Sequence, residues 1–380
     1  MKNTAYRVAF TTGAIIVGII IILIFTFLGK KGRGPLEDFF TEMGTTVTDL
    51  EKSILLINRE PVRSKALGWF NNYRNNKELI TNPDTILLGI YDNHYKESFD
   101  HMLELEDSLQ FNLPFIQLYT AWGDKEAERF PVKYAKAIYD LGSVPFITWE
   151  PWLNDFDREE HKLAPKNDPN KNGLKDIVKG DYDFYIEKWA HDVKKFNKIV
   201  FIRLGHEMND PYRYPWGPQN NKPEDFIAAW QHVVNKFKDL KVDNAVWVWS
   251  PHPAYLMYNE YYPGDDFVDW VGVGALNYGT VALWSKWWSF DEIFGNYYDW
   301  LAAFNKPIVI TEFGSLAVGG QRDKWYEQAL TNIPQKYPSL KALLFYNNDN
   351  DNTTLSKSLV WSINNDSLTI NAIKRAVKTW

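Results

Sequence analysis

The sequence predicts an α/β protein, a (β/α)8 TIM barrel preceded by one transmembrane helix and a short helical stalk. Three observations predict it: one long uncharged run near the start, eight short apolar runs that alternate with helical patterns, and polar and aromatic residues that follow those runs. The 380 residues include no cysteine, which excludes disulfide frameworks and thiolate metal sites. They include 17 Trp, 21 Tyr and 23 Phe. Because Trp is rarely fully buried, we expect part of this aromatic excess to lie on a functional surface.

Residues 8–29 carry no charged side chain and are mostly branched aliphatic or Phe. At about 1.5 Å per residue a helix of this length crosses a hydrocarbon core of about 30 Å. Residues 27–31 read FLGKK, a poor signal-peptidase site, so a retained anchor is favoured over a cleaved signal peptide. We therefore expect residues 1–33 to be a membrane anchor, residues 34–80 a stalk or a helical segment packed on the barrel, and residues 81–380 the barrel domain.

The stalk region carries apolar residues at alternating spacings of four and three. They are Leu36, Phe40, Met43, Val47, Leu50, Ile54 and Ile57. This pattern predicts an amphipathic helix that lies on the folded domain, with weak self-association through residues 36–57 as the alternative.

The charge of the chain is divided unevenly. The net charge is −6, and the first 33 residues hold five cations and no acid, so the remainder has 37 basic and 48 acidic residues and a charge of −11. An acidic domain is a poor electrostatic match for nucleic acid, and we expect no nucleic-acid partner.

Eight β-branched and aromatic runs lack polar alternation, as parallel strands covered on both faces do. They are residues 85–91, 114–119, 144–149, 199–204, 245–249, 270–275, 307–311 and 341–346. Helical patterns separate them; one begins at Pro223 and places Phe226, Trp230, Val233 and Phe237 on one face. An open doubly wound sheet is the alternative, but no glycine-rich phosphate loop follows any run.

In a barrel of this kind, the chemistry occurs at the carboxyl ends of the strands. Trp149, Glu150 and Trp249 end predicted strands, and Trp216 follows the fourth. Pyranose rings stack on aromatic side chains and their hydroxyls need polar partners, so these ends suit a sugar polymer.

Two carboxylates stand at the ends of the fourth and seventh predicted strands, Glu207 and Glu312. Strands three positions apart around the ring can present end groups that face each other. Glycoside hydrolysis uses two carboxyl groups, about 5–5.5 Å apart for retention and about 6.5–9.5 Å apart for inversion of configuration. Arg203 and Glu207 share one parity, which predicts that both point into the lumen, where the arginine favours an ionised carboxylate.

Three segments resemble family 26 of the glycoside hydrolases: residues 201–209, FIRLGHEMN; residues 214–217, YPWG; and residues 307–314, PIVITEFG. The resemblance implies a retaining (β/α)8 enzyme with Glu207 as acid/base and Glu312 as nucleophile. It places His206 beside the acid/base and Tyr278 near the nucleophile. With these we expect a substrate-binding set of Arg203, His206, Asn209, Tyr278, Trp149, Glu150, Trp216 and Trp249.

The resemblance also bears on the substrate. The family consists mainly of endo-β-mannanases, with mixed-linkage β-1,3-1,4-glucanases and β-1,3-xylanases as minorities. Residues 210–216 read DPYRYPW where a mannanase is expected to continue with Gly and several Trp, so β-glucan is slightly favoured over β-mannan. We expect an endo-acting hydrolase on the outer side of the cell membrane. A catalytically silent sugar-binding barrel that assists exopolysaccharide export is the alternative.

No metal or cofactor is expected. His206-Glu207 lacks the second histidine of an H-E-x-x-H zinc site, and no other ligand spacing in the chain is convincing. A metal-dependent polysaccharide-modifying enzyme is therefore the weakest of the readings.

Overall fold

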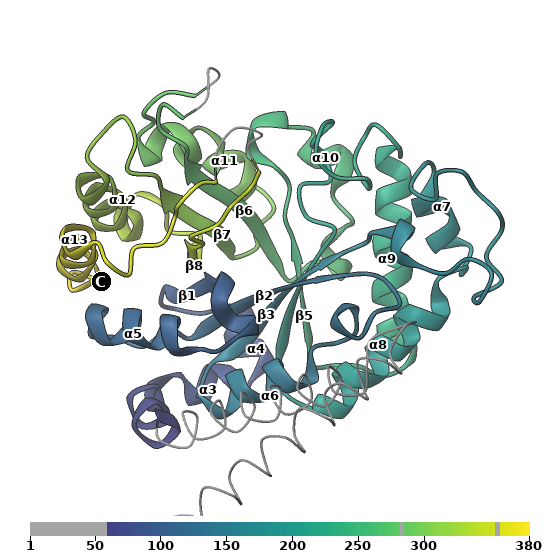
Figure 1. Ribbon diagram of the computed structural model, residues 1–380, viewed down its shortest axis with the longest axis horizontal. Helices are drawn as coiled ribbons and strands as arrows, with labels where there is room; N and C mark the ends of the chain where they lie inside the picture. Colours follow the sequence, from purple (N-terminus) through teal and green to yellow (C-terminus); the bar gives the residue numbers. More distant parts are fainter. Residues whose placement is uncertain (1–58, 282–284, 354–357) are drawn as a thin grey trace, which may run out of the picture. The chain divides into compact units, whose positions relative to one another are not determined.

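The computed structural model describes residues 59–281, 285–353 and 358–380 (Figure 1). Eight parallel strands form a closed barrel in chain order, which confirms the predicted barrel. The strands are β1 (Leu87–Asp92), β2 (Phe115–Ala121), β3 (Val144–Glu150), β4 (Val200–Leu204), β5 (Ala245–Trp249), β6 (Trp270–Asn277), β7 (Ile308–Ser315) and β8 (Leu340–Asn347). The main difference from expectation is β7, which continues to Ser315, so Glu312 lies within the strand and not at its end.

The predicted anchor in residues 1–33, the stalk up to residue 58 and the proposed self-association segment lie outside the described residues. Within the described part of the chain, no helix is both long enough and apolar enough to cross a membrane.

The α-helices connect and cover the strands (Figure 1). They are α3 (Asn71–Arg74), α4 (Lys77–Thr81), α5 (Asp100–Leu109), α6 (Val132–Asp140), α7 (Gly173–Val178), α8 (Asp183–Phe196), α9 (Pro223–Asp239), α10 (Tyr258–Tyr261), α11 (Asn296–Ala302), α12 (Arg322–Lys336) and α13 (Ser367–Val377). Helix α9 begins at Pro223 as predicted, and its Phe226, Trp230, Val233 and Phe237 are buried.

The helical residues before the first strand belong to the barrel. Leu67, Phe70 and Ile80 are buried in one cluster with residues of all eight strands, and the Phe70 ring meets the Phe115 ring edge-on at 6.0 Å. Arg63 forms a buried ion pair with Glu106 of α5 at 2.6 Å. Residues from Arg59 onward therefore form one compact unit with the barrel.

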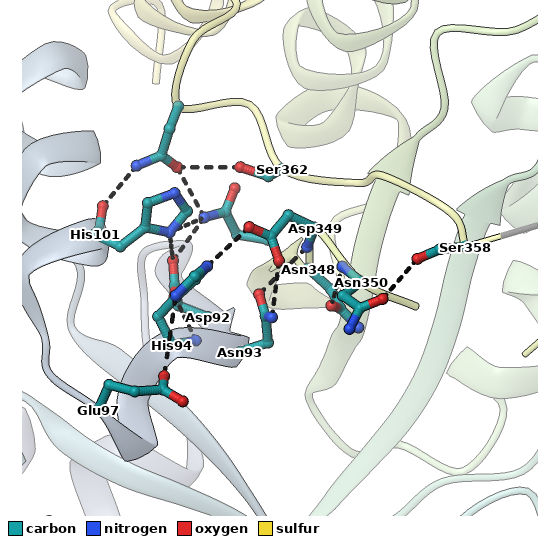
Figure 2. A network of polar contacts seen from close by, with 12 residues as sticks. Asp92, Asn93, His94, Glu97, His101, Asn348, Asp349, Asn350, Ser358 and Ser362 are labelled. Atoms are coloured by element: carbon teal, nitrogen blue, oxygen red, sulfur yellow. Dashed lines mark hydrogen bonds and ion pairs between the residues drawn. The ribbon is translucent and has the colours of Figure 1, made fainter. Parts of the chain in front are cut away.

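The barrel closes where β1 meets β8, with Asp92 in register with Asn347. Two histidine–aspartate pairs stand at this seam (Figure 2). Nδ1 of His101 lies 2.7 Å from Asp92, and Nε2 of His94 lies 2.8 Å from Asp349. Asn347 also donates a hydrogen bond to Asp92, at 2.6 Å. The seam is thus held by side chains at the same barrel end that carries the two candidate carboxylates.

Candidate active site

A cavity of about 600 Å³ opens at the carboxyl ends of the strands. Both predicted carboxylates line it. Its other lining residues come mainly from the loops after β4, β5 and β6: Asp210, Tyr212, Arg213, His252, Pro253, Ala254, Tyr255, Gly274, Leu276, Tyr278, Trp288, Glu292, Ile293, Tyr297 and Thr353. Five of these side chains are aromatic, so the cavity offers both ring faces and polar groups.

Glu207 reaches the cavity from a turn and not from a strand. Strand β4 ends at Leu204, and Gly205 and Glu207 both adopt left-handed backbone conformations, with φ of 48° and 52°. The Glu207 N–H donates to the carbonyl of Ser250 at 2.6 Å, which fixes the turn to the end of β5. Glu207 lines the cavity as predicted, but strand parity is not the reason, because alternation stops where the extended backbone stops. A left-handed conformation is unfavourable for glutamate and persists where the surroundings enforce it.

The Glu207 carboxylate lies against β6, beside Gly274. Gly274 is in register with Glu312 on β7. A Cβ atom at Gly274 would lie 3.7 Å from Oε1 of Glu207. The Glu207 carboxylate therefore lies over the strand next to Glu312, as two groups acting on one bond require.

Glu312 is held as an ion. Its Oε1 accepts hydrogen bonds from Nη2 of Arg203 at 2.8 Å and from the Tyr119 hydroxyl at 2.7 Å. Arg203 is 1% exposed and is itself fixed by Thr148 at 2.9 Å and Thr311 at 2.7 Å. The prediction that Arg203 supports an ionised carboxylate holds for Glu312.

The two carboxyl groups differ in proton affinity. Burial raises the pKa of Glu207 to about 7, and the charge of Glu312 adds to this, although Arg213 and Arg203 oppose it. Burial also disfavours the charge on Glu312, but Arg203 and the Tyr119 hydrogen bond outweigh it and lower the pKa of that carboxyl. Oε2 of Glu207 is buried without a hydrogen-bond partner in the described chain, its nearest cation being Arg213 at 3.6 Å. Environments that separate two pKa values in this way separate an acid from a base.

The residues around Glu207 hold its turn in place. Nε2 of His206 lies 3.0 Å from the Tyr214 hydroxyl, and the Trp216 indole N–H donates to the His206 carbonyl at 2.7 Å. Tyr214 and Trp216 stack at 4.7 Å. Burial, together with the charges of Arg203 and Arg213, keeps the pKa of His206 well below its usual range, so the ring is neutral. His206 and Trp216, expected to contact substrate, are each 1% exposed and instead shape the loop.

Asn209 and Glu150 also lie beside the site without lining the cavity. Asn209 donates to the carbonyls of His252 at 2.9 Å and Leu256 at 2.8 Å, so it joins the loops after β4 and β5. Glu150 lies 3.9 Å from the His206 ring and accepts from the Trp152 indole N–H at 3.2 Å. Tyr278, by contrast, lines the cavity, with its ring edge-on to Trp361 at 5.0 Å.

The prediction that Trp149 and Trp249 contact sugar was wrong. Both are 0% exposed. Trp149 stacks on Trp189 of α8 at 4.2 Å, and Trp249 packs against Phe304 at 5.2 Å. Their strand positions face the helices and not the lumen. Eight Trp side chains in the described chain are less than 2% exposed, so much of the aromatic excess forms the layer between strands and helices.

Several cavity residues were missed by the sequence analysis. Arg213 and Tyr212 lie within the segment that departs from the mannanase pattern, and that departure was the available signal. Tyr255 and Tyr297 lie in a loop and a helix that no strand-end argument reaches.

Three cavity side chains have metal-binding chemistry. Ligand atoms of Glu207, Asp210 and His252 lie within 4.8 Å of one another. The guanidinium of Arg213, 3.6 Å from Glu207, supplies positive charge to the same carboxylate and disfavours a second cation there.

The sequence of this chain is similar to those of known proteins. The model of glycosyl hydrolase family 26 matches residues 146–373. Endoglucanase H of Acetivibrio thermocellus is 32% identical over 253 residues, which are 64% of this chain and 25% of that protein. A mannan endo-1,4-beta-mannosidase of Bacillus subtilis strain 168 is 30% identical over 190 residues, 45% of this chain and 48% of that protein. The chain thus spans a quarter to about a half of these relatives.

The fold is also similar to those of solved structures. The structure of GH26C from Muricauda sp. MAR_2010_75 superposes with a TM-score of 0.57 at 17% identity, covering 83% of this chain and 89% of that one. The predicted resemblance to family 26 of the glycoside hydrolases is confirmed by the sequence matches. The chain belongs to glycosyl hydrolase family 26.

Proposed function

We propose that this chain is a retaining endo-β-glycanase that cleaves β-1,3-1,4-glucan or β-1,4-mannan through a covalent glycosyl-enzyme intermediate. The observation that carries the proposal is the asymmetry of the carboxyl pair. Glu312 is bound by Arg203 and Tyr119, whereas Glu207 is buried without a hydrogen-bond partner on Oε2. One group is thereby suited to attack as an anion and the other to deliver a proton.

In the first step Glu207 gives its proton to the glycosidic oxygen while a Glu312 oxygen attacks the anomeric carbon. The bond from that carbon to the leaving oxygen breaks, and an ester to Glu312 forms. Both hydrogen bonds to Glu312 go to Oε1, which leaves Oε2 to attack. The leaving sugar departs as a neutral alcohol.

In the second step a water molecule replaces the departed sugar. Glu207, now a carboxylate, takes a proton from the water as its oxygen attacks the anomeric carbon. The ester breaks, Glu312 becomes an anion again, and Glu207 is protonated for the next cycle. A group with a pKa of about 7 performs both transfers near neutral pH.

The substrate remains between two β-glycans. The named relatives are an endoglucanase and a mannan endo-1,4-beta-mannosidase, so their names support both. We favour the glucan because Tyr212 and Arg213 line the cavity in the segment that departs from the mannanase pattern. A digestion panel of mixed-linkage glucan, mannan, β-1,3-xylan and cellulose, with product lengths, decides the substrate and the mode of attack. Mannooligosaccharides as the sole products would overturn the preference for glucan.

The mechanism is tested by the first product and by one variant. NMR of the fresh product should show the β-anomer before mutarotation, and an initial α-anomer would contradict retention. Glu312→Gln should abolish hydrolysis and retain oligosaccharide binding. A wild type that binds β-glycans but turns none of them over would favour the silent sugar-binding barrel.

We also propose that residues 8–29 anchor the protein in the cell membrane as a single span, with the barrel on the extracellular side. The uncharged run supports this proposal. The full chain should sediment with membranes and be cleaved by protease added to whole cells, and deletion of residues 1–33 should release it. A barrel protected in intact cells would contradict the orientation.

Cross-linking of the full chain, compared with a form starting at residue 59, tests self-association through residues 36–57.

A further inference from the structure

Three large apolar side chains stay exposed just outside the cavity. Leu256, Met257 and Trp300, here called the rim patch, are 38%, 45% and 52% exposed. Tyr255 lines the cavity immediately before Leu256 in the chain, and Tyr297 lines it one helical turn before Trp300. The rim patch therefore begins where the cavity lining ends. Helix α10 begins directly after Met257 and helix α11 contains Trp300, and both helices lie in the upper part of Figure 1.

The backbone presents two of these side chains in an unusual conformation. Leu256 and Met257 have φ of 54° and 56°, in the left-handed region that non-glycine residues rarely occupy. The Leu256 carbonyl accepts a hydrogen bond at 2.8 Å from Asn209, two residues after Glu207. Strained residues persist where their surroundings enforce them, and they concentrate at functional sites. The backbone at Leu256 and Met257 thus directs two apolar side chains to solvent, and it is hydrogen-bonded to the loop that carries Glu207.

The third member of the patch is held by other rings. The Trp300 ring lies 6.3 Å from Tyr258 and 6.5 Å from Tyr297. Tyr258 is 6% exposed, and its hydroxyl donates to the Pro253 carbonyl at 2.6 Å. A supported aromatic ring loses little conformational freedom when a ligand stacks on it.

We propose that the rim patch binds sugar rings of the polysaccharide that extend beyond the catalytic cavity, as an outer platform for long chains. This rests on the proposed function, because the occupant is the same polymer that the cavity cleaves. A polymer seated in the cavity must leave it across a rim, and this rim offers apolar faces continuous with the lining. Glu260 and Asp299 are exposed beside the patch, and their charges disfavour an anionic lipid surface.

The platform is tested with Trp300→Ala in the full chain, solubilised in mild detergent. We expect KM for the polymer to rise about fivefold with kcat unchanged, since one partly exposed ring is lost. For a short oligosaccharide that fills only the cavity, kcat/KM should stay within about twofold. Trp69→Ala is the matched control, because Trp69 is also 52% exposed but lies before the first strand. Trp69→Ala should change the kinetic constants for neither the polymer nor the oligosaccharide.

A binding measurement separates this proposal from the proposed function. In a Glu312→Gln background, native gels containing the polysaccharide should retard the chain, and Trp300→Ala should weaken the retardation about fivefold. If the wild type hydrolyses nothing but this difference holds, the function fails and the platform stands. Equal effects on polymer and oligosaccharide, no effect on either, or a change in oligomeric state in place of binding would each overturn the platform.

Discussion

Arg203 donates a hydrogen bond from Nη2 to Oε1 of Glu312 at 2.8 Å from the strand three positions away in the barrel. The arginine is 1% exposed, and the Glu312 side chain, which lines the cavity, is 14% exposed. The ion pair therefore works in a medium where charges interact more strongly than in water. Through this bond, Arg203 on β4 favours the ionised form of the Glu312 carboxylate on β7.

Arg203→Met should move the acid limb of the pH–activity profile to higher pH. The arginine lowers the pKa of Glu312, so its loss raises that pKa and more of the carboxyl is protonated as pH falls. The free energy of unfolding should also fall by about 3–5 kcal/mol, since one buried charge loses its partner. The measurements are kcat/KM against pH and chemical denaturation. Arg203→Lys, which retains the charge, should keep the limb closer to wild type; an unmoved acid limb in Arg203→Met would contradict the role given to the ion pair.

Arg213→Gln should move the opposite limb. Burial raises the pKa of Glu207, and the nearby Arg213 charge holds that rise back, so its removal raises the pKa further. Hydrolysis needs Glu207 protonated, and activity should therefore persist to higher pH in the variant. Because the two carboxyls titrate as a pair, the profile reports values of the pair. Arg213→Lys serves as the control, and a shift of the alkaline limb to lower pH would refute the assignment.

The sequence predicted strand positions well because parallel strands in a barrel are apolar on both faces. The predicted strands that begin at Val144, Ala245 and Trp270 have the same first residues as β3, β5 and β6. The position of the Glu207 side chain could not be predicted in the same way. Its turn depends on left-handed backbone at Gly205 and Glu207 and on a hydrogen bond to Ser250, which is distant in the chain.

The aromatic residues show a second limit. A tryptophan at a strand end, such as Trp149, has the same local sequence whether its ring faces the lumen or the helices. The parity of the strand decides, and a shift of one residue reverses it. The rings that do line the cavity, Trp288 and Tyr297 among them, come from the loop after β6 and from α11, whose course no strand-end pattern specifies.

The seam between β1 and β8 predicts a pH-dependent stability. The hydrogen bond with Asp92 raises the pKa of His101 in the folded protein, although partial burial opposes this. Its contribution is therefore fully present below the unfolded pKa of about 6.5 and is lost as pH rises through the folded value. His101→Gln should lower the melting temperature more at pH 6 than at pH 9, by a few degrees at most. His191→Gln, on an exposed position of α8, is the control; an equal loss at both pH values would refute the prediction.

Trp149→Phe and Trp288→Ala should separate packing from substrate binding. Trp149 is enclosed between β3 and α8, so its truncation should lower the free energy of unfolding by about 1–3 kcal/mol and leave KM unchanged. Trp288 lines the cavity, with Lys286 at 4.2 Å from its ring, so its loss should raise KM with little effect on unfolding. Thermal denaturation and kinetics on one oligosaccharide measure both effects. If Trp149→Phe raised KM while its stability stayed at the wild-type value, the ring would belong to the sugar-binding surface after all, and the packing role given to it here would be refuted.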